Sequence, residues 1–139
     1  ANVSERRYAA VVEGLVEAES GTAISWLKEN KAKVMYSVAE CPDGQRAVTH
    51  WRVLRRSNGY TLVELDLETG RKNQIRVHMK DMGHPVAGDA KYGAKSDPLR
   101  RLGLHARSLA FRHPVSGQTV RYESPVPPVF TNVLGESND

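Results

Sequence analysis

The chain has 139 residues, of which 40% are hydrophobic, and this is enough to form one ordinary hydrophobic core. Its net charge of +4 and sequence pI of about 9.4 favour a polyanionic partner but are modest for a dedicated nucleic-acid binder. Cys41 is the single cysteine, which excludes an internal disulfide, and no apolar run is long enough to cross a bilayer. We therefore expect residues 1–139 to form one unit in a reducing, cytoplasmic setting, without a membrane partner.

The first third of the chain predicts short strands and turns. Residues 7–14 form an apolar run that ends in glycine, which is typical of a strand. Residues 17–33 show no clear hydrophobic period and predict no element, whereas residues 34–38 predict a second short strand. Residues 41–44, Cys-Pro-Asp-Gly, have the composition of a β-turn.

The clearest local structure is a β-hairpin with arms at residues 48–56 and 60–67. The connecting Asn58-Gly59 accepts the positive φ angles of a tight hairpin turn. In the second arm, apolar and acidic residues alternate: Val63, Leu65 and Leu67 with Glu64, Asp66 and Glu68. This alternation predicts an antiparallel sheet with one face on a core and the other in solvent.

After Gly70 the hydrophobic period changes from two to about 3.6. Three apolar residues at i, i+4 and i+7, beginning at Ile75, predict an amphipathic helix over residues 71–82. The glycine and proline that follow would end it. The basic residues of this segment line up beside the apolar stripe: Lys72, Arg76 and Lys80.

A last hairpin is predicted from residues 104–111 and 119–123, and residues 126–139 are expected to form an extended, loosely held tail. The elements together predict an α+β fold. Its main part is an antiparallel β-sheet of hairpins with one main helix packed on it.

The segment from Glu68 to Gly93 joins an Arg/Gln/Arg cluster to a His-Pro turn and a Gly-Asp-x-x-Tyr-Gly loop. It resembles the third motif of the RluA-type pseudouridine synthases, Thr-Gly-Arg-x-x-Gln-[Ile/Leu]-Arg-Val-His-Met followed by Gly-His-Pro-x-x-Gly-Asp-x-x-Tyr. Residues 6–14 are similar to that family's Lys-x-Tyr-x-Ala-x-Val-x-Gly motif. The resemblance extends from about residue 6 to residue 127 and implies half of the pseudouridine synthase catalytic fold.

The resemblance implies isomerisation of uridine to pseudouridine in structured RNA, with large-subunit rRNA as the family default and tRNA as the alternative. It implies no cofactor and no metal. The family's nucleophilic aspartate belongs to an Arg-Leu-Asp-x-x-Thr-Ser-Gly motif that does not occur in residues 1–139. We therefore expect the C-terminal half of a catalytic domain, inactive alone, whose partner is the N-terminal half of the same protein. The alternative is a non-catalytic RNA-binding module.

The resemblance gives Arg76 and Tyr8 to the active site. Arg76 matches the family arginine that pairs with the catalytic aspartate, because a desolvated carboxylate needs a neighbouring guanidinium to stay ionised. Tyr8 matches the tyrosine that lies against the target uracil, where its ring can stack on an extruded base. The alternatives are a surface arginine with an ordinary glutamate partner and a half-buried strand tyrosine.

A set of basic residues is expected to contact RNA phosphates: Arg71, Lys72, Lys80, Lys91, Arg100 and Arg101. The first two lie at the predicted helix start, where backbone amides also attract anions. The alternative for each is a solvated surface charge. Asn73 stands where the family has histidine, so it keeps a hydrogen bond but not a titrating group.

Two other assignments are discounted. The histidines and Cys41 match no zinc spacing, and His84 and His113, each before a proline, are expected to satisfy turn backbones. Asp89 lies in the strongest motif, but the family's Gly-Asp loop looks structural, so we expect a structural role.

Overall fold

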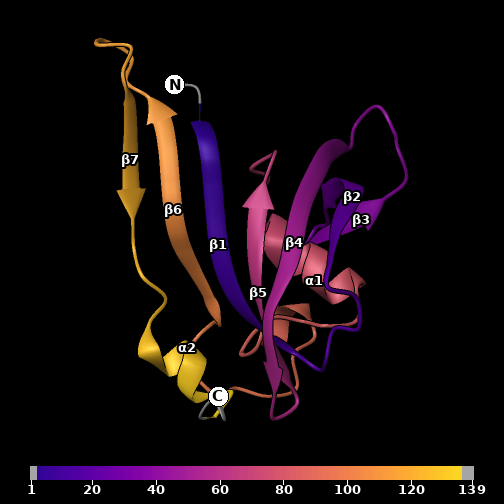
Figure 1. Ribbon diagram of the computed structural model, residues 1–139. Coiled ribbons are helices and arrows are strands. Elements are labelled where there is room, and N and C mark those ends of the chain that lie inside the picture. Colours follow the sequence, from indigo (N-terminus) through magenta and orange to yellow (C-terminus); the bar gives the residue numbers. More distant parts are fainter. Residues whose placement is uncertain (1–2, 136–139) are drawn as a thin grey trace.

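The structure is a computed structural model that describes residues 3–135. Seven strands form one antiparallel sheet in the order β3-β2-β4-β5-β1-β6-β7 (Figure 1). The strands are β1 (Val3–Glu13), β2 (Ser20–Glu29), β3 (Met35–Val38), β4 (Gln45–Ser57), β5 (Tyr60–Leu67), β6 (Leu104–Arg112) and β7 (Thr119–Glu123). The helices are α1 (Gln74–Asp81), the 3-10 helix η1 (Ala90–Tyr92) and α2 (Pro128–Asn132). The predicted fold class is confirmed.

The predicted hairpins are present. β4 and β5 meet at a two-residue turn in which Asn58 (φ 54°) and Gly59 (φ 81°) have the positive φ angles that this turn requires. The predicted turn at residues 41–44 is closed by a backbone hydrogen bond, and β3 falls within the predicted residues 34–38.

Three expectations differ from the structure. Residues 17–33 contain the ten-residue strand β2, which the sequence hid because it is only partly covered and its Ile24 is exposed. The main helix begins three residues late because Asn73 is left-handed (φ 55°). The tail is not extended throughout, since α2 packs on the sheet through Phe130 and buries Leu134 nearby. Residues 136–139 of the predicted tail lie outside the described residues.

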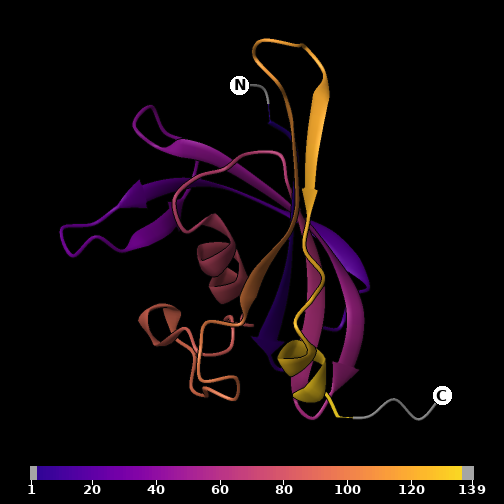
Figure 2. The ribbon, with the colours of Figure 1, turned by 90° about the vertical axis from the view of Figure 1, so that its left-hand side faces the viewer.

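One face of the sheet packs on α1. Apolar residues of β1 and β5, including Ala10, Val12 and Leu65, contact Ile75 and Met79 of the helix. Figure 2 shows α1 and η1 on one side of the central strands and α2 on the other. The predicted apolar face of the helix is therefore confirmed.

The reverse face is covered at one end only. There Ala9, Val11 and Leu62 pack against Phe130 and Leu134, so the expectation of a fully solvent-exposed face is wrong for this end. At the other end none of the helices described within residues 3–135 covers the strands, and charged side chains lie on the sheet.

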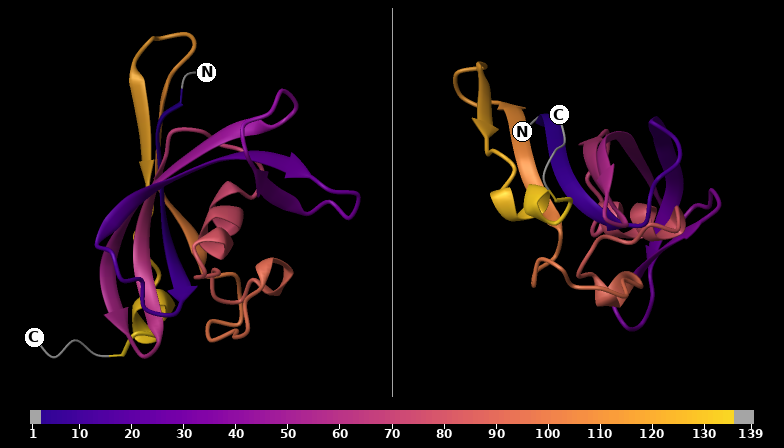
Figure 3. Two further views of the ribbon diagram at one scale, coloured as in Figure 1. Left: turned by 90° about the vertical axis from the view of Figure 1, so that its right-hand side faces the viewer. Right: turned by 60° about the horizontal axis from the view of Figure 1, so that its bottom comes forward.

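The β2–β3 hairpin at one edge of the sheet and the β6–β7 hairpin at the other point in different directions, because the sheet twists along its length (Figure 3). A third core fills the space where the β2–β3 hairpin meets α1 and η1, with Leu27, Met35, Val77 and Tyr92 among its members. Among the described helices, none is long and apolar enough to span a bilayer.

Candidate active site

Arg76 of α1 is held by a fork to Asp89. Its Nε donates to Oδ2 at 2.9 Å and its Nη2 donates to Oδ1 at 2.8 Å. The Asp89 side chain is 1% exposed and that of Arg76 is 22% exposed. The hydrogen bonds to Asp89 raise the pKa of Arg76 above its ordinary value, more than burial lowers it, so the guanidinium stays charged.

Two further groups fix the plane of this guanidinium. Tyr92 places its ring 4.7 Å from the Arg76 Cζ, in a cation–π contact. Asn73 accepts from Arg76 Nη1 at 3.3 Å and donates to the Tyr92 hydroxyl at 3.2 Å. Asn73 thus keeps the hydrogen-bonding role expected of it.

The loop that carries Asp89 depends on Gly88. Gly88 has φ +81°, and a Cβ at this position would lie 2.4 Å from the carbonyl oxygen of Arg101. Glycine therefore lets the chain pass close to another backbone while it directs Asp89 towards α1. The burial and pairing of Asp89 support the structural role expected for it.

Gln74 connects the start of α1 to the sheet. Its Nε2 donates to the carbonyl oxygen of Val48 and to Thr49, and its Oε1 accepts from the Thr69 hydroxyl and the Arg71 amide. All four contacts lie between 2.7 and 3.1 Å. The central Gln of the motif is therefore a buried anchor.

Tyr8 and Arg76 line the same small hollow, which we call the α1-side hollow. It has a volume of about 160 Å³ and lies between β1, β6 and the residues before α1. Its lining residues are Tyr8, Leu67, Arg71, Asn73, Gln74, Ile75, Arg76 and Leu104. This volume is below the roughly 300 Å³ at which pockets for drug-sized ligands begin, so the hollow suits a single small ring.

The other predicted contacts are distributed more widely. Arg71 lines the α1-side hollow, but its amide bonds Gln74 and its Nε donates to the Arg46 carbonyl oxygen. Lys72 pairs with Glu29 at the β2–β3 hairpin. Both residues precede α1 and so do not lie at its first turn as expected. Their contact with RNA phosphates stays a prediction.

The remaining four basic residues do not line the α1-side hollow. Lys80 and Arg100 are exposed, and Lys91 donates to the Lys33 carbonyl oxygen at 3.4 Å. Arg101 bonds two backbone carbonyls, and its guanidinium lies 5.3 Å from the Phe130 ring centroid. The contact of these four residues with RNA stays a prediction.

Four of the five histidines take part in internal hydrogen bonds, and His105 is the exception. His84 Nδ1 lies 2.8 Å from the Glu13 carbonyl oxygen, and His113 Nδ1 accepts two backbone amides of its own turn, as expected. His78 is 1% exposed and lies between Thr49 and Ser25. Burial lowers the pKa of His78, so it is neutral at pH 7.

Comparison of the sequence with known proteins identifies relatives of this chain. The profile of the RNA pseudouridylate synthase family matches residues 1–81. The RNA pseudouridine synthase YlyB of Bacillus subtilis (strain 168) is 47% identical over 123 residues, which cover 88% of this chain and 40% of YlyB. The ribosomal large subunit pseudouridine synthase D of Neisseria meningitidis is 38% identical over 142 residues, covering 94% and 38%. The chain spans less than half the length of these relatives.

A solved structure has a similar fold. Human RNA pseudouridylate synthase domain containing 1 superposes with a TM-score of 0.80 at 26% identity, covering 96% of this chain and 62% of the human one. The fold and the motif-bearing site define the class as the RNA pseudouridine synthases. The chain belongs to the RNA pseudouridylate synthase family, and within it to the RluA type, which confirms the resemblance.

The sequence reasoning missed two features of the site. It did not anticipate that Asp89 is the carboxylate that pairs with Arg76, although the separation of 13 residues across the motif loop was visible. It also missed the charged hollow on the reverse face, whose arginines come from four different strands.

Proposed function

We propose that this chain is the C-terminal part of the catalytic domain of an RNA pseudouridine synthase, and that the whole protein isomerises uridine to pseudouridine in structured RNA. The observation that carries the proposal is that Tyr8 and Arg76 line one hollow of about 160 Å³. Large-subunit rRNA is the favoured substrate, because a relative is named for that activity. We place the protein in the cytoplasm.

Arg76 can meet a second carboxylate. A guanidinium has five N–H donors, of which two bond Asp89 and one bonds Asn73. Two donors remain, one on Nη1 and one on Nη2. In the proposed mechanism they hold the nucleophilic aspartate of the N-terminal half in its ionised form, while Asp89 keeps the fork in place.

Tyr8 acts on the base. Its side chain is half-buried on β1, beside the position at which β6 has one extra residue. Its ring lines the hollow and offers a face to an extruded uracil, and its hydroxyl can approach the edge of that base. The reaction breaks the glycosidic bond between N1 and C1′, rotates the uracil and forms a carbon–carbon bond between C5 and C1′. The C5 hydrogen leaves as a proton and N1 takes up a proton, so the product is an isomer of uridine.

The test uses the full-length protein and RNA labelled with tritium at uracil C5, since isomerisation releases that hydrogen. We expect Arg76→Ala and Arg76→Lys to lower release at least about 100-fold, the loss typical for one electrostatic group at a reacting centre. Arg76→Lys keeps the charge but removes the fork. Lys95→Gln, an exposed lysine outside the α1-side hollow, is the control and should match the wild type.

The outcomes separate the two functions considered. Wild-type release on an rRNA transcript but not a tRNA transcript would support the rRNA assignment. Salt-dependent RNA binding by the full-length protein without any release would favour a non-catalytic RNA-binding module. Normal release by both Arg76 variants would overturn the role of this arginine.

A further inference from the structure

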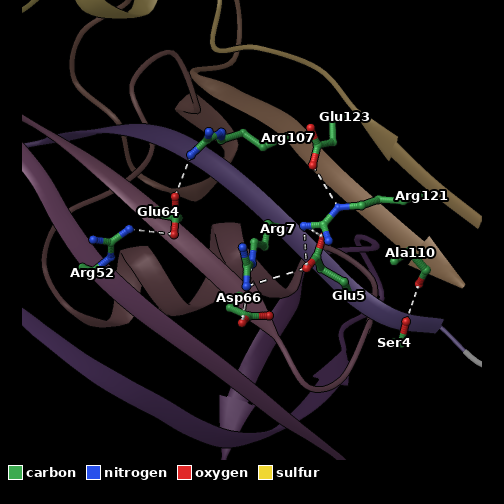
Figure 4. Close-up of polar contacts among 10 residues, drawn as sticks. All are labelled: Ser4, Glu5, Arg7, Arg52, Glu64, Asp66, Arg107, Ala110, Arg121 and Glu123. Atoms are coloured by element: carbon green, nitrogen blue, oxygen red, sulfur yellow. Dashed lines mark hydrogen bonds and ion pairs between the residues drawn. The ribbon is translucent and has the colours of Figure 1, made fainter. Parts of the chain in front are cut away.

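A larger hollow of about 550 Å³ lies on the sheet face opposite α1, and we call it the reverse-face hollow. Four arginines from four strands line it together with two glutamates: Arg7, Arg52, Arg107, Arg121, Glu64 and Glu123. Figure 4 shows these side chains gathered across β4, β5, β1, β6 and β7. Because Arg7 precedes Tyr8 on β1, the two hollows open on opposite faces of the sheet.

An irregularity in β6 adds a donor to this hollow. Arg7 pairs with Ser108 and Tyr8 pairs with Ala106, so Arg107 is an extra residue between the two pairs. Such a β-bulge breaks the alternation of side chains. Arg107 and Ser108 therefore both line the reverse-face hollow, although they are consecutive in the chain.

Two poorly exposed carboxylates hold the arginines. Glu64, 18% exposed, accepts from Arg52 at 3.0 Å and from Arg107 at 2.6 Å. Glu5, 14% exposed, accepts from Arg121 at 3.1 Å and lies 3.6 Å from Arg7. The four arginine side chains are themselves 39–62% exposed. Each carboxylate thus orients two guanidiniums. Arg121 also pairs with Glu123 at 2.9 Å and Arg7 lies 4.0 Å from Asp66, and all four arginine side chains stay partly open to solvent.

The residues that line the hollow sum to 4 − 2 = +2, and Glu5 and Asp66, which contact Arg121 and Arg7 from outside the lining, bring the whole cluster to 4 − 4 = 0. The recognition of an anion therefore depends on the orientation of the guanidiniums and not on an excess of charge. The hydroxyls of Ser108 and Ser124 add neutral donors, and no aromatic ring lines the hollow. Oriented guanidinium forks with hydroxyls suit phosphate oxygens. A lining without an aromatic ring offers no stacking platform for a base.

We propose that the reverse-face hollow binds the phosphodiester backbone of the substrate RNA, at a segment other than the one that carries the target uridine. This inference rests on the proposed function. A structured RNA that reaches both hollows passes around the edge of the sheet. Contacts of this kind position an RNA without reading its sequence. The exposed Glu123, which pairs with Arg121 at 2.9 Å, is the group that a phosphate displaces.

The experiment measures RNA affinity against salt concentration with the full-length protein. Arg52→Gln with Arg121→Gln removes two of the four cations and leaves one arginine on each central carboxylate. We expect the slope of log K against log salt to become shallower by about 1.4 to 1.8, because each lost phosphate contact accounts for about 0.7 to 0.9. The matched control is Lys31→Gln with Lys95→Gln, two exposed lysines outside this hollow, which should keep the wild-type slope.

A single variant guards against a folding artefact. Glu123→Gln removes a 69% exposed rim carboxylate and should strengthen RNA binding at low salt. Wild-type slopes for the double variant, together with unchanged affinity for Glu123→Gln, would overturn the inference. If the wild-type protein still releases tritium from uridine in that case, the proposed function stands and only the second RNA contact fails. Absence of both RNA binding and tritium release in the wild type would overturn both.

Discussion

Arginine side chains differ in burial and pairing between the two faces of the sheet. On the α1 side, Arg76 has a carboxylate partner that is 1% exposed, a defined fork and an aromatic ring against its plane. On the reverse face, the carboxylates are shared and the arginines reach into solvent. A guanidinium that must hold a reacting group benefits from a fixed position, whereas one that meets a flexible phosphate chain benefits from remaining exposed.

The largest expected effect tests this contrast through stability. Arg76→Met keeps an apolar stem but leaves Asp89 buried without its cation. We expect the free energy of unfolding to fall by about 3 kcal/mol, the low end for breaking a buried pair, because Arg76 is partly exposed. Arg52→Met is the matched control and should cost less than about 1 kcal/mol, since Glu64 keeps Arg107. Equal losses in urea denaturation of the two full-length variants would contradict the distinction.

A second test asks whether the loop fixes the fork. Gly88→Ala forces a Cβ against the Arg101 carbonyl oxygen at a positive φ, and we expect a loss of about 2 kcal/mol or more in unfolding free energy. Gly83→Ala has a similar φ of +85° but nothing within 4 Å of the added Cβ. It should cost only about 1 kcal/mol. Similar thermal shifts for both variants would mean that close contact at Gly88 is unimportant.

The features that the sequence predicts well are those that local chemistry decides. Asn58-Gly59 fixes the hairpin because few other residue pairs accept both positive φ angles. The spacing of Ile75 and Met79 identifies the buried face of α1 without reference to the sheet. Motif resemblance also brings Tyr8 and Arg76 together, and both line the α1-side hollow.

The features that the sequence hides depend on distant partners. β2 has an exposed Ile24 and lacks a clear period, so its strand conformation depends on pairing with β3 and β4. α2 has only five residues and exists because Phe130 packs on the reverse face. The bulge at Arg107 is a matter of register between β1 and β6, which no single segment encodes.

Burial on the α1 side of the sheet also affects the titration of His78, which is 1% exposed. Burial lowers its folded-state pKa below the ordinary 6.5, so the unfolded chain binds more protons than the folded one as the pH falls below 6.5. The contribution of His78 to stability is therefore largest above pH 6.5 and decreases below it, by at most about 1.4 kcal/mol per pH unit. Asp81 opposes the shift but does not reverse it.

His78→Gln is the variant that isolates this contribution. It removes the titrating group while it keeps polar atoms for Thr49 and Ser25. We expect a lower unfolding free energy at pH 7.5 but a shallower decline between pH 7 and pH 5 than in the wild type. Parallel pH profiles from urea titrations would show that His78 does not carry the proton linkage.

The smallest expected effect concerns an ion pair that belongs neither to the buried Arg76–Asp89 fork nor to the reverse-face hollow. Lys72 pairs with Glu29, and the two side chains are 56% and 32% exposed. The hydrogen bond from Lys72 lowers the pKa of Glu29, so this carboxylate is ionised at neutral pH and competes with any phosphate for Lys72. If Lys72 contacts RNA, Glu29→Gln should tighten RNA binding by a few-fold at low salt and leave the melting temperature nearly unchanged. Adding Lys72→Gln to Glu29→Gln should then abolish the gain. A gain that survives in this double variant would mean that Glu29 repels RNA directly, and Lys72 would then be only the counter-ion of a surface carboxylate.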